Sequence, residues 1–98
     1  MKINNKEYKI KVTLRAMMIF EQLTGKPFSI SGLLDQYIYF YSIILANNKD
    51  FTYTFDEFID YLDEHPELIS EFNEALTNYS KLLGQFNGEE KDDSKKKV

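Results

Sequence analysis

The chain has 98 residues, no cysteine and a formal net charge of −4, which is enough for one domain with its own core. The lack of cysteine excludes disulfides, thiolate metal sites and cysteine nucleophiles. The first stretch, MKINNKEYKIKV, is charged and has no apolar run. We therefore expect neither a signal peptide nor a membrane-spanning helix, and a cytoplasmic protein.

Charge is divided unevenly along the chain. Residues 1–31 carry six bases and two acids, a net +4, whereas residues 32–81 carry two bases and ten acids, a net −8. The two regions should attract each other, either inside one fold or head to tail between copies in a homo-oligomer. The acidic middle section disfavours nucleic acid as a partner.

The first elements are expected to be a hairpin and a helix. Residues 2–12 predict a β-hairpin, because apolar residues alternate with lysines in YKIKV and the preceding Asn4 begins a turn-forming Asn-Asn pair. Thr13 is a suitable N-cap for a helix over residues 14–24. Gly25 should end that helix.

A central helix is predicted over residues 33–46, LLDQYIYFYSIILA, with Ser31 as its cap. It is apolar nearly all round, so it should lie in a core or against a partner. About fourteen residues are too few to span a bilayer. The chain's eight Phe and seven Tyr leave the same two alternatives open, a ring-rich core or rings that face a partner. From the excess apolar character we select these candidate partner-binding residues: Tyr37, Tyr39, Phe40, Tyr41 and Ile43.

Two further helices are expected. Thr54 begins a capping box, which predicts a helix over residues 55–64 with its apolar stripe inward and its acids outward. Pro66 separates it from a fourth helix that continues to about Phe86. Residues 87–98 have no apolar periodicity, and we expect a disordered tail there.

Few residues suit catalysis. The only histidine, His65, precedes a proline at a helix junction, and the chain contains no phosphate-loop, zinc-protease or serine-hydrolase motif. A calcium loop that begins at Asp50 would need glycine at its sixth position, where Phe55 stands. We therefore expect no catalytic residue, no cofactor, no metal site and no enzymatic activity.

A family resemblance is carried by LRAMMIFEQLTGKPF at residues 14–28 and TFDEFIDYLDEHPEL at residues 54–68. With a lysine-rich hairpin before them and an apolar helix between them, these segments resemble the tail assembly chaperones of long-tailed phages and prophages. The similarity covers about residues 2–86. It implies a mainly helical, non-enzymatic protein that coats the apolar helical tape-measure protein, keeps it soluble and helps recruit tail-tube subunits. Such proteins do not remain in the mature virion.

We therefore predict one mainly α domain over residues 1–86, with an N-terminal β-hairpin followed by about four helices in a small bundle. The expected function is that of a phage tail assembly chaperone in the cytoplasm of the bacterial host, with the tape-measure protein as partner. An alternative from another class is a small acidic phage-encoded inhibitor or adaptor, whose acidic face occupies a basic host protein.

Overall fold

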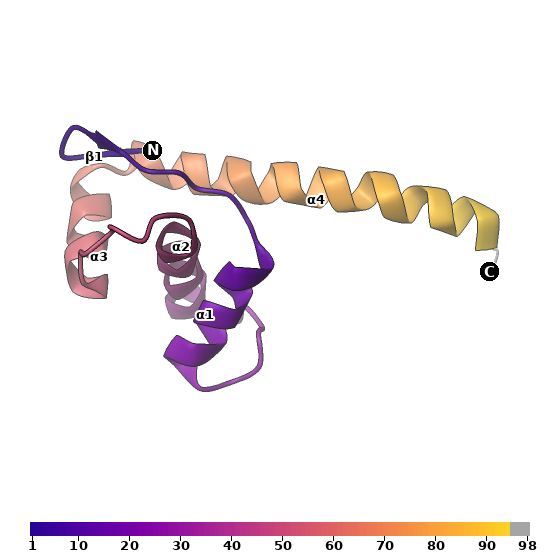
Figure 1. The fold of residues 1–98 in the computed structure, drawn as a ribbon, viewed down its shortest axis with the longest axis horizontal. Helices are drawn as coiled ribbons and strands as arrows, with labels where there is room; N and C mark the ends of the chain where they lie inside the picture. Colours follow the sequence, from indigo (N-terminus) through magenta and orange to yellow (C-terminus); the bar gives the residue numbers. More distant parts are fainter. Residues whose placement is uncertain (95–98) are drawn as a thin grey trace.

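The computed structural model describes the backbone of residues 1–94 and the side chains of residues 1–82. It confirms the mainly helical fold with an N-terminal hairpin and four helices (Figure 1). Helix α4 extends to Ser94, past the expected end near Phe86, and the tail predicted at 87–98 lies outside the residues with described side chains. The elements in chain order are β1 (Lys2–Ile3), β2 (Lys6–Glu7), α1 (Leu14–Thr24), α2 (Leu33–Asn47), α3 (Phe55–Glu64) and α4 (Glu67–Ser94).

The hairpin is shorter than predicted, because β1 and β2 have two residues each and residues 8–12 belong to no strand. Asn4 and Asn5 make the turn with φ angles of 51° and 68°, the left-handed region that asparagine tolerates. After the hairpin, the backbone of Lys9 bonds to the side chain of Asn48 at the end of α2. The Lys9 N–H donates to Oδ1 at 3.0 Å, and Nδ2 donates back to the Lys9 carbonyl at 2.7 Å. An asparagine side chain thus takes the place of a partner strand.

The ends of α1 and the start of α3 confirm the predicted capping residues. Thr13 Oγ1 accepts a hydrogen bond from the N–H of Ala16 at 3.1 Å, and Gly25 ends α1 with a φ of 73°. At α3, Thr54 and Glu57 exchange the two hydrogen bonds of a capping box, at 2.9 and 3.1 Å. Local sequence signals therefore decide where these helices begin and end.

The start of α2 differs from the prediction, because the N-cap is Gly32, with a φ of 95° and no side-chain capping bond, rather than Ser31. The carboxylate of Asp35, in the first turn of α2, instead holds the loop that leads into the helix. Its Oδ2 accepts hydrogen bonds from the N–H and hydroxyl of Ser31 at 3.0 and 3.2 Å, and from Lys26 Nζ at 2.6 Å. The hydrogen bonds from Lys26 and then Ser31 lower the pKa of Asp35 below its ordinary value.

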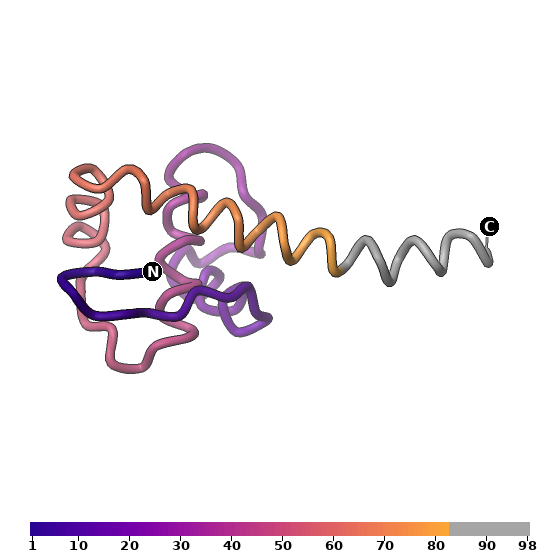
Figure 2. Tube along the Cα trace, turned by 90° about the horizontal axis from the view of Figure 1, so that it is seen from above, coloured from indigo at the N-terminus to yellow at the C-terminus, as the bar shows by residue number. Residues whose placement is uncertain are grey.

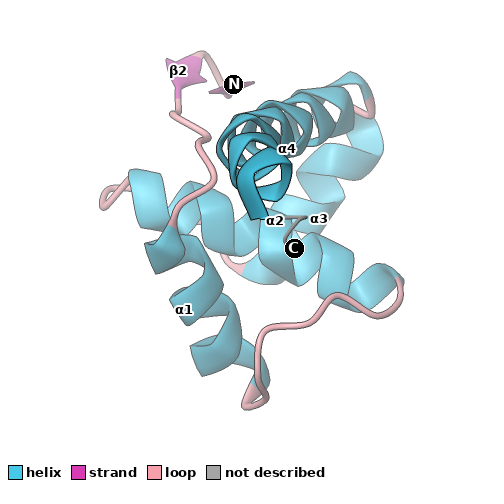
Figure 3. Cartoon of the chain, turned by 90° about the vertical axis from the view of Figure 1, so that its right-hand side faces the viewer, coloured by secondary structure: helices cyan, strands magenta, loops and turns pink. Residues whose placement is uncertain are grey.

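Helix α2 is the centre of the fold, with α1 and α3 on opposite sides of it and α4 lying across it between them (Figures 1 and 3). Viewed from above, α4 starts next to α3 and runs across the other helices (Figure 2). Aromatic rings from α2 contact each neighbour, so the ring-rich composition is explained by the core. These ring contacts are Tyr39 with Phe20 and Phe28, Phe40 with Phe72, and Tyr41 with Phe51, Phe55 and Phe58.

Candidate partner-binding groove

Three of the five candidate residues of α2 lie in the core and present no surface to a partner. Tyr39, Phe40 and Ile43 keep 4%, 1% and 0% of their side-chain surface exposed. The Phe40 ring stacks on Phe72 with centroids 4.6 Å apart, and burial raises the pKa of Tyr39 to about 12. The selection of these three as surface residues was wrong, because α1, α4 and α3 each cover a different side of the middle of α2.

The other two candidates are partly buried, and they differ in what they contact. The hydroxyl of Tyr41 donates to the backbone carbonyl of Tyr53 at 2.7 Å, which fixes the loop before α3. Burial, followed by the nearby Glu57 carboxylate, raises the pKa of Tyr41. Tyr37 instead lines an open groove between α2, α3 and the start of α4. Of the five candidates, Tyr37 is therefore the one that lines this groove.

The groove has a volume of about 530 Å³ and a lining that is almost entirely apolar. Leu33 and Leu34, in the first turn of α2, are 74% and 64% exposed. Large apolar side chains this exposed, side by side and next to a depression, are typical of a surface that another molecule covers. The lining residues are Leu33, Leu34, Tyr37, Phe55, Ile59, Leu62, Asp63 and Ile69.

Sequence reasoning missed the two leucines because it sought apolar excess in the middle of α2. A usable signal was present, since Leu33 and Leu34 lie one turn before Tyr37 and therefore share its side of the helix. On α3, Phe55 and Ile59 are four residues apart and continue the same apolar surface. The sequence predicts that the apolar stripe of this helix faces the interior, but Phe55 and Ile59 both keep part of their surface accessible.

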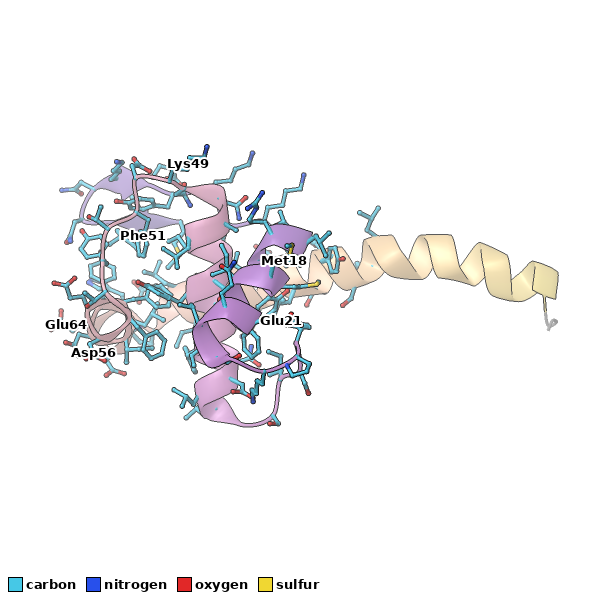
Figure 4. The ribbon with its side chains drawn as sticks, turned by 60° about the horizontal axis from the view of Figure 1, so that its bottom comes forward. Met18, Glu21, Lys49, Phe51, Asp56 and Glu64 are labelled. Carbon is cyan, nitrogen blue, oxygen red and sulfur yellow. The ribbon has the colours of Figure 1, made fainter. Side chains whose placement is uncertain are left out.

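The α3 wall of the groove is acidic on its outer side. Five exposed acids lie on this ten-residue helix, and among the side chains of residues 1–82 none of them forms an ion pair with a base. Figure 4 shows Asp56 and Glu64 on α3, away from the labelled residues of α1. Beyond this row lies a second depression of about 240 Å³. Its lining is polar and acidic: Asn4, Tyr53, Glu57, Asp60, Tyr61 and Glu64.

The basic N-terminal region neutralises the acidic middle section only in part. Lys6 forms an ion pair with Asp50, and Lys26 forms one with Asp35 at 2.6 Å. Both pairs lie in or beside loops rather than on α3. Within the described side chains, the internal attraction expected from the sequence therefore leaves the acids of α3 facing solvent.

The chemistry of the remaining polar groups is limited in the described residues. No group of three histidine, cysteine or carboxylate side chains within residues 1–82 could hold a metal ion. His65 stacks on Tyr61 with ring centroids 4.2 Å apart, and its Nδ1 lies 3.5 Å from Oε2 of Glu67. Through residue 94, no helix combines the length and apolar character that a membrane crossing requires. The chain matches no family model, no curated protein and no solved structure.

Proposed function

We propose that this protein is a phage tail assembly chaperone without enzymatic activity, which holds an apolar helical segment of the tape-measure protein in the groove between α2 and α3. The observation that carries the proposal is the groove itself, in which seven of eight lining residues are apolar or aromatic and two leucines are largely exposed. A groove with two helical walls is a common receptor for an amphipathic helix. The resemblance described above names the client.

The exposed leucines set the expected strength of the contact. Full burial of one leucine side chain stabilises a complex by about 1.5 to 3 kcal/mol. Leu33 and Leu34 are 74% and 64% exposed, so a helix that covers one of them should gain about 1 to 2 kcal/mol from it. Each 1.4 kcal/mol is a factor of about ten in affinity. Removing one leucine should therefore weaken binding by about tenfold.

The proposal places the protein in the cytoplasm of the bacterial host, during tail assembly and not in the mature virion. There it would keep the tape-measure protein soluble and help recruit tail-tube subunits. Self-association of the chaperone along its client is compatible with the separated charges of the chain, since heterologous contacts between copies can repeat along a filament.

The test is co-expression with the tape-measure protein encoded downstream, followed by a solubility assay and co-purification. The wild-type chain should keep the tape-measure protein in the soluble fraction, and Leu34→Ser should release it to the pellet. Leu14→Ser is the matched control, because Leu14 is 72% exposed on α1 and does not line the groove. Equal loss in both variants, or no loss in Leu34→Ser, would remove the groove as the client site.

The acids of α3, which pair with no base among the side chains of residues 1–82, favour a second candidate function, an acidic phage-encoded inhibitor that occupies a basic host protein. In that case, reversing the charges of Asp56, Asp60 and Asp63 should abolish activity, and Leu34→Ser should leave it intact. For a chaperone, Leu34→Ser should weaken binding more than the charge reversals do, because the apolar groove supplies most of the binding energy. The same two variants therefore separate the two functions.

A further inference from the structure

The groove has acids along the outer edge of its α3 wall and no unpaired charge on its α2 wall. On α3, Asp56, Asp60 and Asp63 recur at intervals of four and three residues, so they share one face of the helix. Asp63 itself lines the groove, next to Ile59. The opposite wall is α2, whose one charged side chain, Asp35, is buried and paired with Lys26. A bound segment would therefore meet carboxylates along one edge only.

The acids at the end of α3 are unfavourably placed for the isolated fold, unlike those at its start. Asp56 and Glu57 lie in the first turn of α3, where the positive end of the helix dipole favours them. Asp63 and Glu64 lie in the last turn, at the negative end, where a carboxylate is disfavoured. Neighbouring acids three and four residues apart also repel one another. Such local conflicts occur mainly where function requires them.

No base relieves this repulsion within the described side chains. The chain has no lysine or arginine between Lys49 and Lys81, and the ion pairs of residues 1–82 leave the acids of α3 unmatched. The exposed acids also continue around α3 to Glu64 in the second depression, where two tyrosine side chains join the lining. A cation placed above this wall would meet several carboxylates at once.

We infer that the segment held in the groove is an amphipathic helix with lysine or arginine along the edge that faces α3, and with no charge on the edge that faces α2. This inference rests on the proposed function and specifies the chemistry of the client. The apolar ridge of that helix supplies affinity, while its basic edge sets the orientation and the rate of association. A helix with acids on that edge would be rejected, because like charges would meet along α3.

The test uses two synthetic helical peptides with the same leucine ridge, one with four lysines and the other with four glutamates along one edge. Fluorescence anisotropy measures the affinity of each for the full chain at low and high salt. The wild type should bind the lysine peptide at least tenfold more tightly at low salt, and the preference should shrink as salt screens the charges. The double variant Asp60→Asn/Asp63→Asn should lose most of the preference.

Two controls separate the inference from the proposed function. Glu74→Gln removes an exposed acid of α4 that lines neither depression and should keep the full preference. Leu34→Ser should weaken both peptides alike. If both peptides bind equally and Leu34→Ser weakens both, the basic edge is refuted while the chaperone groove stands. If neither peptide binds the wild type, the groove does not hold a helix and both proposals fail.

Discussion

The assignment of the middle of α2 to the core can be tested with a series at Ile43. This side chain is 0% exposed, so Ile43→Val removes one buried methylene group and should cost about 0.5 to 1.5 kcal/mol of unfolding free energy. Ile43→Ala should cost about 2 to 5 kcal/mol, a large share of the roughly 5 to 15 kcal/mol expected for a domain of this size. In thermal unfolding, each 1 kcal/mol should lower the midpoint by about 4 to 8 °C.

The matched control is Leu34→Ala, a truncation on the same helix at a side chain that is 64% exposed. It should change the unfolding free energy by no more than about 0.5 kcal/mol. Urea unfolding followed by far-ultraviolet circular dichroism measures all three variants, because the fold is mainly helical. If Ile43→Val lowers the unfolding free energy no more than Leu34→Ala does, Ile43 is not in the core. It would then again be a candidate for binding a partner.

Three further variants test local features. Thr54→Ala should cost about 1 kcal/mol of unfolding free energy by removing the cap of α3, and an unchanged urea midpoint would contradict the capping box. Gly25→Ala should cost about 1 to 2 kcal/mol of unfolding free energy through backbone strain alone, because φ is 73° and no atom lies near the added methyl. Gly25→Asn should cost less, because asparagine tolerates this φ. Equal costs for the two variants would argue against the left-handed conformation. The Asp35 contacts should stabilise the fold above about pH 4 and be lost as pH falls through its lowered folded-state pKa. A carboxyl NMR titration should show that pKa rising toward its ordinary value in Lys26→Ala, and no rise would exclude the ion pair as a cause.

Much of the secondary structure could be predicted because its signals are local. The N-cap Thr13, the stop at Gly25 and the capping box at Thr54 act within one helical turn, and the structure has all three where the sequence places them. The start of α2 was harder, because Lys26 and Asp35 are nine residues apart and their contact depends on the path of the loop between them. The hairpin is shorter than predicted for a similar reason, because the backbone of Lys9 bonds to the side chain of Asn48, 39 positions away in the sequence.

The candidate site was predicted less well, because burial is a property of the whole packing arrangement. Composition indicated an excess of rings on α2 but not which neighbours would cover them. Phe40 is buried because α4 brings Phe72 against it from 32 positions away in the sequence. Leu33 and Leu34 stay exposed because the helices that cover the middle of α2 leave its first turn open.

By itself, the sequence determined the helices, most of their ends, the hairpin turn and the separation of charge, since all of these depend on residues close together in the chain. Only the tertiary structure decided which apolar residues became core, where the groove lies and which acids have no base beside them among the side chains up to residue 82. Those outcomes depend on surfaces that meet only when α1, α3 and α4 pack around α2, and local propensity carries no information about which of two apolar faces a distant helix will cover.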